Sequence, residues 1–400
     1  MTPKNRKHYE RALQIIPWAT QTNAKRLNAG CQETMPPFIK RADGCRMWDL
    51  DDKEYIDFRS SLGPILLGYR HPAVDQAVRA QMENGVLFSM ASPLELETAE
   101  AIIENVPWLE QVRFMKTGAD ACSCCVRLAR AYNGRDHIVS IGYHGYHDQF
   151  AYMWPNNGVP KEWRKYVHDI PYGDCAAVER IFAHNGDKIS AVITEPYNWM
   201  EIPGDDFLRI LRRECDRHGS LLIYDEILTG FRLARGGAQE YFGITPDLSA
   251  FAKAMANGYP LSAYGGKKKI MQQLEKTILT ITHGGETLSL AACLAVMQVI
   301  KNEPVHEHIQ AMGKRLKDGW NEIIRETGVL AHCGGVEQMP FFHFDFADPQ
   351  ENATWRDRLF TRLYGRGVFA NDRWIMMYAH QADDIDYTLE QFRLSLKEMC

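Results

Sequence analysis

Short apolar runs alternate with amphipathic stretches between about residue 60 and residue 300 of this chain. Runs of this length, bounded by polar residues, are typical of strands that are covered on both faces, and their alternation with helices favours a mostly parallel sheet. The sequence therefore predicts an α/β fold with helices on both faces of the sheet. The runs lie near residues 112, 138, 190, 221 and 248.

The two ends of the chain differ from this alternating region. Residues 1–59 predict a helix and a small hairpin region, because alternating strands flank Asp-Gly and Asp-Asp turns. Residues 60–300 are expected to form a large domain. Residues 301–400 predict a smaller terminal α+β domain with a long helix over 305–327 and a final helix that begins at Asp384.

Asp225 and Lys253 are the main candidates for chemistry. Asp225 closes the apolar run Leu221–Tyr224, so it lies at the carboxyl end of a predicted strand, where ligands bind in open α/β sheets. A carboxylate there can hold a pyridine nitrogen protonated, and a buried lysine can attack a carbonyl carbon as a neutral amine. Pyridoxal phosphate (PLP) chemistry needs these two groups most. Taken singly, a helix-capping Asp225 and a surface Lys253 are the simpler interpretations.

A glycine turn after the first apolar run predicts an anion site. Residues 115–121 (Met-Lys-Thr-Gly-Ala-Asp-Ala) lie between the apolar run 112–114 and a helical pattern that begins near Cys122. Exposed amide groups and the positive end of the helix dipole would bind a phosphate at such a turn. Many helices begin with Thr or Gly, so the motif alone is a weak signal.

Two longer motifs, Asp-Glu-Ile-Leu-Thr-Gly-Phe-Arg and Thr-Pro-Asp-Leu, lie within residues 221–268. This stretch resembles the cofactor region of class III aminotransferases, the fold type I PLP-dependent transferases related to glutamate-1-semialdehyde aminomutase. The resemblance implies PLP as cofactor and a mostly parallel, seven-stranded-type sheet. It also implies that Asp225 pairs with the pyridine nitrogen, that Ile227 packs against a ring face and that Lys253 forms the Schiff base.

The glycine turn is similar to the Ser-Gly-Thr-Glu-Ala turn of the same family. That similarity places Gly118 and Ala119 at the phosphate of the cofactor. Two departures are present, because Ala119 lacks the hydroxyl that the family usually supplies and Asp120 replaces glutamate. The phosphate is therefore expected to depend more on backbone amides.

The motifs that follow two of the predicted strands also resemble motifs of this family. Tyr143 belongs to a Tyr-His-Gly motif after the apolar run 137–141, and an aromatic ring there would stack on the pyridine face. Glu195 belongs to a Glu-Pro motif after the run 189–194, and the resemblance places it beside the phenolic edge of the cofactor. A solvated strand end remains the alternative for Glu195.

Residues 282–287 (Thr-His-Gly-Gly-Glu-Thr) resemble the segment that reaches across the dimer interface in this family and donates a hydroxyl to the phosphate of the neighbouring subunit. We align Thr282 with that donor and keep Thr287 as the competing choice. The resemblance thus implies a homodimer with active sites at the subunit interface.

The predicted activity is transfer of an amino group from an amino donor to an aldehyde or ketone acceptor. Two departures argue against a dedicated glutamate-1-semialdehyde aminomutase: residues 16–26 lack a Pro-Gly-Gly turn, and Leu62 stands where those enzymes carry a tryptophan. Residues 20–26 and 284–292 look more like relatives that aminate sugars or other hydroxylated carbonyl compounds. An intramolecular aminomutase, an amino-acid epimerase and a noncatalytic α/β binding protein remain as alternatives.

Composition limits the partners and the location. The net charge is −5 and no basic run is interleaved with aromatic residues, so nucleic acid is not an expected partner. The best apolar run, 288–300, is too short to span a membrane. The 10 cysteines are scattered and the amino terminus lacks a hydrophobic signal core, which favours reduced thiols in a cytoplasmic protein.

No metal site is predicted. His144, His147 and Asp148 form a loose group, and Cys122 and Cys125 share one face of a helix. Neither set has the second pair of ligands that a zinc site normally needs. The cysteines are therefore expected to be small residues of the buried core.

Overall fold

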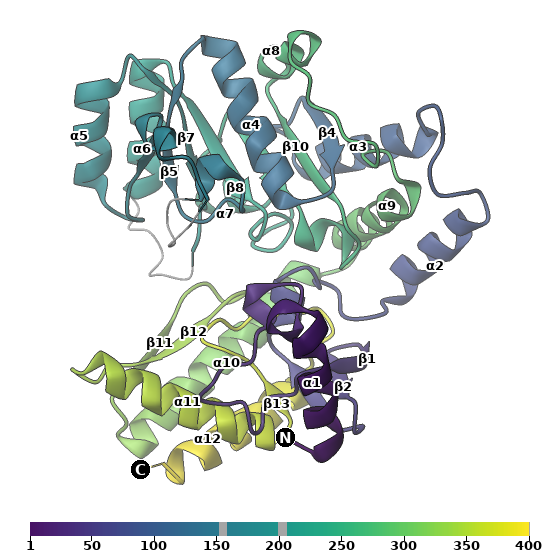
Figure 1. Cartoon of the computed structure of the whole chain (residues 1–400), viewed down its shortest axis with the longest axis vertical. Helices are drawn as coiled ribbons and strands as arrows, with labels where there is room; N and C mark the ends of the chain where they lie inside the picture. The colour runs from purple at the N-terminus through teal and green to yellow at the C-terminus, as the bar shows by residue number, and fades with distance from the viewer. Residues whose placement is uncertain (152–157, 199–205, 400) are drawn as a thin grey trace. The chain divides into compact units, whose positions relative to one another are not determined.

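The computed structural model describes residues 1–151, 158–198 and 206–399. The chain forms two compact units, one made of Met1–His71 with Pro304–Cys400 and the other of Pro72–Glu303 (Figure 1). The unit boundaries thus lie at 71/72 and 303/304, compared with 59/60 and 300/301 in the division expected from the sequence. No helix in the described ranges is both long and apolar enough to cross a membrane.

The unit Pro72–Glu303 is built on a seven-stranded sheet with the order β4-β10-β9-β8-β7-β5-β6. The strands from β9 to β6 in this order are parallel neighbours, whereas β10 is antiparallel to both β4 and β9. The predicted mostly parallel α/β sheet is therefore confirmed. The strands are β4 (Gln111–Met115), β5 (His137–Ile141), β6 (Val167–Asp169), β7 (Ile189–Thr194), β8 (Leu221–Glu226), β9 (Leu248–Phe251) and β10 (Ser262–Gly266).

Helices connect most of these strands, as the alternating pattern of the sequence predicts (Figure 1). The α-helices of this unit are α2 (Pro72–Met82), α3 (Pro93–Asn105), α4 (Gly118–Asn133), α5 (Cys175–Asn185), α6 (Phe207–His218), α7 (Ala238–Phe242), α8 (Lys268–Met271) and α9 (Thr287–Asn302).

Both faces of the sheet are covered by packed helices. Every residue of β7 and β8 is buried, as strands between two helical layers require. Side chains alternate between the faces along a strand. Ile193 and Ile223 therefore join the core that contains α4, whereas Val192 and Leu222 join the core that contains α5 and α6.

The other unit joins the two ends of the chain in one four-stranded sheet with the order β1-β2-β3-β13. The strand β13 is only two residues long and pairs in parallel with β3. The predicted hairpin turns at Gly44, whose φ of 55° lies in the left-handed region that glycine tolerates. The strands of this unit are β1 (Ile39–Asp43), β2 (Arg46–Asp49), β3 (Glu54–Asp57) and β13 (Val368–Phe369), with a separate hairpin of β11 (Ala331–Gly334) and β12 (Phe341–Phe344).

The two helices predicted for the carboxyl-terminal part of this unit are both present. The helix predicted over 305–327 has these bounds in the structure. The final helix begins two residues before the predicted Asp384, because Gln381 and Asp384 form a reciprocal capping box at its start. The α-helices are α1 (Pro3–Ile15), α10 (Val305–Thr327), α11 (Pro349–Gly365) and α12 (Ala382–Lys397).

A left-handed segment follows β3. Ser60, Ser61 and Leu62 have φ values of 50°, 51° and 74°, and Gly63 continues the segment with a φ of 103°. Residues other than glycine rarely adopt this backbone conformation, because their Cβ atom comes too close to the following carbonyl oxygen. The segment is held by hydrogen bonds from Leu62 N to Arg59 O and from Gly63 N to Ser60 O, both 2.8 Å long.

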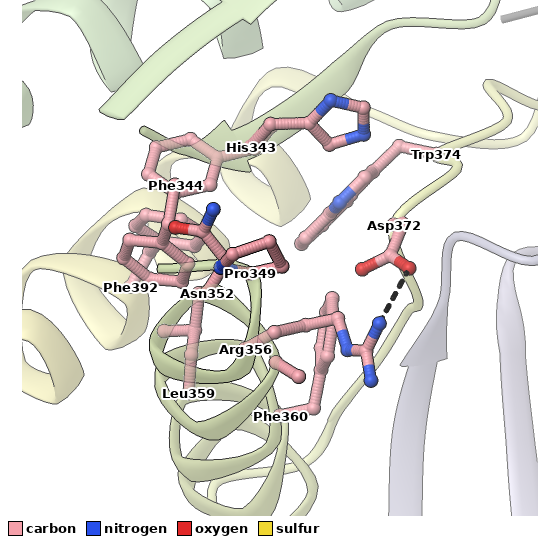
Figure 2. A pocket seen from close by; sticks show the side chains of 12 residues that line it. His343, Phe344, Pro349, Asn352, Arg356, Leu359, Phe360, Asp372, Trp374 and Phe392 are labelled. Atoms are coloured by element: carbon pink, nitrogen blue, oxygen red, sulfur yellow. Dashed lines mark ion pairs between the residues drawn. The ribbon is translucent and has the colours of Figure 1, made fainter. Parts of the chain in front are cut away.

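Aromatic side chains build the core between α10, α12 and the strands beside them. The ring centroids of Trp320 and Trp374 lie 5.0 Å apart in an edge arrangement. Trp374 also borders a cavity of about 220 Å³, at which Arg356 and Asp372 form an ion pair of 3.6 Å (Figure 2). None of the residues that line this cavity is a predicted site residue.

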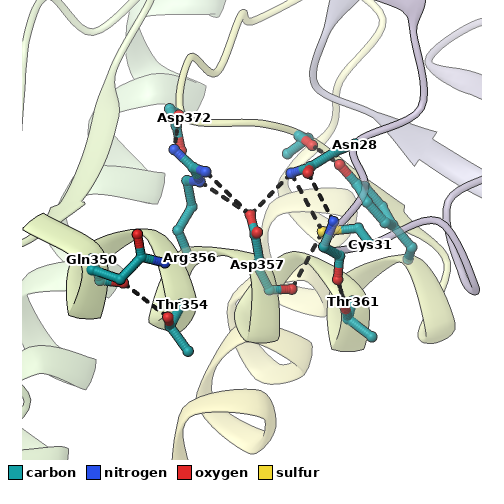
Figure 3. A network of polar contacts seen from close by, with 11 residues as sticks. Asn28, Cys31, Gln350, Thr354, Arg356, Asp357, Thr361 and Asp372 are labelled. Atoms are coloured by element: carbon teal, nitrogen blue, oxygen red, sulfur yellow. Dashed lines mark hydrogen bonds and ion pairs between the residues drawn. The ribbon is translucent and has the colours of Figure 1, made fainter.

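Polar contacts fasten the amino-terminal segment to α11. The Asp357 carboxylate accepts a hydrogen bond of 2.9 Å from Asn28 Nδ2, and the Cys31 thiol donates to the Asp357 carbonyl over 3.3 Å (Figure 3). Thr361 Oγ1 donates to Gly30 O over 3.3 Å. These contacts join segments more than 300 residues apart in sequence, which explains why both chain ends belong to one unit.

Candidate active site

Four predicted site residues lie where parallel strands end at one edge of the sheet. Asp225 is the fifth residue of β8, and Lys253 begins the 3-10 helix η6 (Lys253–Ala256) just after β9. Glu195 directly follows β7, and Tyr143 follows β5. Because β9, β8, β7 and β5 are parallel neighbours in this order, their carboxyl ends meet at the edge where α/β sheets bind ligands.

The Asp225 carboxylate is buried and held by two donors. Its Oδ2 atom lies 2.7 Å from Nδ1 of His144, and its Oδ1 atom accepts a hydrogen bond of 3.0 Å from the amide of Ile227. Both side chains are almost fully buried, so these contacts are shielded from water. A carboxylate has about four positions at which it accepts hydrogen bonds, so Asp225 keeps capacity to pair with a protonated pyridine nitrogen.

His144 is a site residue that the sequence did not assign. The sequence favoured a structural or cofactor-adjacent use over metal ligation without naming a partner, and the structure places its ring against Asp225. Its position in the Tyr-His-Gly motif after β5 signals that it lies at the ligand-binding edge. The motif does not identify Asp225 as the partner, because β5 and β8 are separated by β7 in the sheet.

The predicted phosphate turn forms the start of α4. Thr117 caps this helix: its hydroxyl accepts from the Asp120 amide over 3.2 Å, and Asp120 Oδ2 accepts from the Thr117 amide over 2.9 Å. Asp120, which replaces the family's glutamate, thereby completes a capping box. The amides of Gly118 and Ala119 have no hydrogen-bond partner within the described part of the chain. Two free amides at a helix start suit an anion such as a phosphate.

Close packing joins this turn to two other predicted segments. A Cβ atom on Gly118 would lie 3.0 Å from the Ile227 side chain, so glycine allows the turn to approach the loop after β8. A Cβ atom on Gly145 would lie 2.4 Å from the Ala119 side chain, which brings the turn against the loop after β5. The structure therefore brings Gly118, Ala119 and Ile227 together near Asp225.

Glu195 and Tyr143 are also in contact. The Tyr143 amide donates to Glu195 Oε2 over 3.2 Å, while 53% of the Tyr143 residue is exposed, so its ring remains accessible to a ligand. Burial, followed by repulsion from the Asp225 carboxylate, raises the pKa of Glu195 to about 7. The charge of Lys253 acts on this pKa in the opposite direction, which shows that Lys253 lies within electrostatic range of Glu195.

Lys253 has an unusual backbone conformation. Its φ is 48°, in the left-handed region, and the following residues Ala254, Met255 and Ala256 are fully buried. Residues in this region cost free energy and persist where the surrounding structure determines them, often at functional sites. The buried helical turn after Lys253 therefore fixes the backbone from which its amine extends.

The two candidate hydroxyl donors before and in α9 differ in their surroundings. Thr282 lies on an exposed turn. Thr287 is buried, and its hydroxyl donates to Gly85 O over 2.8 Å and to Val86 O over 3.0 Å. The Thr287 hydroxyl is thus used within its own chain, whereas Thr282 is accessible to another chain.

One buried group in the described ranges has the ligand types of a metal site. The Cys122 sulfur, a His144 nitrogen and an Asp225 oxygen lie within 4.8 Å of one another. This group differs from both sets considered from the sequence. Metal ligation needs a thiolate, but burial and the Asp225 carboxylate raise the pKa of the Cys122 thiol well above its ordinary value. A hydrogen-bonded cluster around Asp225 fits these conditions better than a metal centre.

The raised pKa of Glu195 gives a testable pH dependence. The unfolded chain releases this proton near pH 4.5, whereas the folded, cofactor-free protein retains it to about pH 7, so stability falls as the pH rises through this window. We expect Glu195→Gln to raise the melting temperature relative to the original protein by about 2–4 °C more at pH 8 than at pH 5. Calorimetry of both proteins at the two pH values measures this, and an equal difference at both would contradict the raised pKa.

The assembled residues suit PLP. The amides of Gly118 and Ala119 can bind its phosphate, Asp225 can pair with its ring nitrogen, and Lys253 can supply the amine. Ile227 comes from the loop after β8, and Tyr143 comes from the loop after β5. Thr282 lies on its exposed turn before α9.

Comparisons with known proteins cover nearly the whole chain. The family model described as Aminotransferase class-III matches residues 28–394. A glutamate-1-semialdehyde 2,1-aminomutase from Syntrophobacter fumaroxidans is 35% identical over 426 residues, which cover 98% of this chain and 98% of that protein. Among solved structures, the PLP internal aldimine form of the FumI protein from a Sphingopyxis species has a TM-score of 0.90 and 29% identity, covering 100% of this chain and 97% of that chain. An omega-transaminase from Sphaerobacter thermophilus has a TM-score of 0.89 and 25% identity, covering 98% and 97%.

Proposed function

Since the chain belongs to the class III aminotransferase family and is a PLP-dependent enzyme, we propose that it moves an amino group from an amino donor to a separate aldehyde or ketone acceptor. One observation carries the proposal. The buried Asp225 carboxylate, held by His144 and the Ile227 amide, lies at the same sheet edge as Lys253. The Asp225 carboxylate, which can pair with a pyridine nitrogen, and the Lys253 amine, which can attack a carbonyl carbon, thus belong to one site.

The cofactor is held at its two ends. Bound PLP supplies an electron sink for the carbanion that forms at the substrate carbon. Asp225 holds a proton on the pyridine nitrogen through a charge-assisted hydrogen bond. The amides of Gly118 and Ala119 bind the phosphate, with the hydroxyl that Ala119 lacks replaced in part by Thr282 of a second copy.

The remaining residues orient the ring and move the proton. Ile227 and Tyr143 hold the ring plane, so that the bond to be broken at the substrate carbon stays aligned with the ring. The Nζ atom of Lys253 acts as the general base that takes the proton from this carbon. Glu195 lies beside the phenolic edge of the ring, and its raised pKa allows it to hold a proton near neutral pH.

The acceptor is a sugar or another hydroxylated carbonyl compound. The sequences of residues 20–26 and 284–292 support this choice, because they look like those of relatives with such substrates. An intramolecular aminomutase is the second candidate, and the glutamate-1-semialdehyde 2,1-aminomutases that are 35% and 33% identical to this chain favour it. The absent Pro-Gly-Gly turn in 16–26 and Leu62 favour transfer between molecules instead.

Isotope transfer distinguishes the two candidates. Purified enzyme would be incubated with ¹⁵N-labelled amino donors and a panel of hydroxylated aldehydes and ketones, and products would be identified by mass spectrometry. Transfer between molecules places the label on the acceptor and leaves a ketone or aldehyde from the donor. Isomerisation of glutamate-1-semialdehyde with no label transfer to any acceptor would reject the proposed activity in favour of the aminomutase.

The enzyme is proposed to act as a homodimer with active sites at the subunit interface. Phe88 and Met90, between α2 and α3, are 46% and 83% exposed, and exposed apolar groups of this kind mark interaction surfaces. Thr287 ties this segment to the start of α9 through Val86, next to the exposed turn of Thr282. Sedimentation equilibrium should give twice the mass of one chain, and a single-chain mass at micromolar concentration would contradict the dimer.

A further inference from the structure

We propose that Cys122 is a positioning residue for the cofactor site: its thiol donates a hydrogen bond to Asp225 and helps to keep this carboxylate ionised opposite the pyridine nitrogen. The inference rests on the proposed function and adds a residue with a role that neither the family resemblance nor the comparisons assign. Cys122 does not touch the cofactor in this scheme but acts through Asp225.

The geometry places the thiol beside the carboxylate. Cys122 lies on α4, one turn after the phosphate turn, and none of its surface is exposed. Its sulfur lies within 4.8 Å of the nearest ligand atoms of His144 and Asp225, so the S–H group is close enough to be directed at the carboxylate. A carboxylate can only accept, so the thiol is the donor.

The proposed bond adds a third donor to one buried anion. His144 Nδ1 reaches Oδ2 over 2.7 Å and the Ile227 amide reaches Oδ1 over 3.0 Å, while the thiol of Cys122 lies in the same close group. Burial disfavours an ionised carboxylate unless donors compensate for the lost water. The thiol stays protonated and able to donate, since burial and Asp225 both raise its pKa.

The donors determine where one proton resides. A carboxylate and a pyridine nitrogen share a proton that lies either on nitrogen, as an ion pair, or on oxygen, with both groups neutral. Hydrogen bonds to the carboxylate stabilise its anion and so favour the proton on nitrogen. Removal of the thiol donor shifts the proton toward Asp225, and the pyridine ring then withdraws electrons less strongly.

Cys125 provides a matched control. It lies on the same helix face one turn later, is also fully buried, and belongs to the same core cluster as Cys122. Among the described residues, the close group of ligand atoms around Asp225 includes the sulfur of Cys122 but not that of Cys125. If the role of Cys122 were purely structural, Cys122→Ala and Cys125→Ala would have the same effect on the cofactor site, because each variant removes one sulfur atom from the same core.

The test measures the ring nitrogen itself. Holoenzymes of the original protein, Cys122→Ala, Cys122→Ser and Cys125→Ala would be loaded with PLP labelled with ¹⁵N in the ring, and the nitrogen chemical shift would be recorded by NMR. We expect Cys122→Ala to move this shift toward that of neutral pyridine and to raise the PLP dissociation constant about fivefold, the effect of one hydrogen bond. Cys122→Ser keeps a donor and should restore most of the original shift, while Cys125→Ala should leave it unchanged.

The outcomes separate this inference from the proposed function. Original protein that fails to bind PLP would overturn the function itself. If it binds PLP but Cys122→Ala keeps the original ring-nitrogen shift and affinity, the function stands and the role of Cys122 is rejected. Equal changes in Cys122→Ala and Cys125→Ala would also reject it, because the effect would then come from core packing. If Cys122→Ala fails to fold, the Cys122→Ser and Cys122→Val holoenzymes give the same comparison, with the donor kept in one and removed in the other.

Discussion

Replacing Lys253 by alanine should remove the yellow colour of the purified enzyme and abolish measurable turnover. The Nζ atom of Lys253 is proposed both to attach the cofactor and to act as the general base. Loss of a general base alone slows a reaction by about 10²–10⁴-fold, and loss of the covalent attachment adds to this. Visible absorption spectra with and without an amine donor, together with the rate of amino transfer, measure the change.

Lys268→Ala is the matched control for this variant. Lys268 is an exposed lysine of α8 in the same unit. We expect it to retain the colour, the spectral shift with an amine donor and the original rate. A Lys253→Ala protein that stays yellow and active would show that the amine of another residue does this work.

Replacing Asp225 by alanine should weaken PLP binding and slow turnover, each by about 10²–10³-fold. The change leaves His144 Nδ1 and the Ile227 amide without their acceptor, and leaves a pyridinium without its counter-charge. Truncating one partner of a buried, hydrogen-bonded charge pair costs about 2–5 kcal/mol, and each 1.4 kcal/mol is a factor of ten. Titration of the cofactor-free protein with PLP gives the affinity, and turnover at saturating PLP gives the rate.

Asp216→Ala controls for the loss of a carboxylate from this unit. Asp216 lies on α6, with 66% of its side chain exposed, in a surface ion pair with Arg212. Surface pairs of this kind contribute little to stability, so the control should bind PLP as the original protein does. Full activity in Asp225→Ala would refute the assigned role of this carboxylate.

The positions of Asp225 and Lys253 were accessible to prediction because each lies at or just after the end of an apolar run. In a parallel sheet such ends meet at one edge, so proximity in space follows from local pattern. The position of Gly118 could also be predicted, because a glycine turn between a strand and a helix indicates an anion site at the start of the helix. These residues are separated in sequence, but strand direction alone brings them to one edge.

His144 and Cys122 could not be placed in the same way. Their contacts with Asp225 depend on the lateral order of strands and on how α4 packs on the sheet, and a single sequence states neither. The choice between Thr282 and Thr287 likewise needed the structure, because only the hydrogen bonds of Thr287 to the 85–86 loop distinguish them.

The pairing of β13 with β3 was also beyond sequence patterns. A strand of two residues, Val368–Phe369, is too short to show any periodicity. This strand nevertheless forms one edge of the four-stranded sheet in the unit Met1–His71 with Pro304–Cys400. Very short strands acquire their partners from the tertiary fold, so a unit made of both chain ends is not visible in local sequence.

The left-handed residues Ser60, Ser61 and Leu62 oppose the folding of their unit. At about 1–2 kcal/mol for each residue, the three together cost about 3–6 kcal/mol, which is comparable with the whole stability of a small domain. The backbone of the neighbouring Phe58 is held by two hydrogen bonds: its amide donates to Phe369 O over 2.8 Å, and its carbonyl accepts from the Ile375 amide over 2.7 Å. When these two hydrogen bonds break, residues 60–62 lower their free energy by leaving the left-handed conformation. We therefore expect the amide hydrogens of this loop to exchange faster than those of the surrounding sheet.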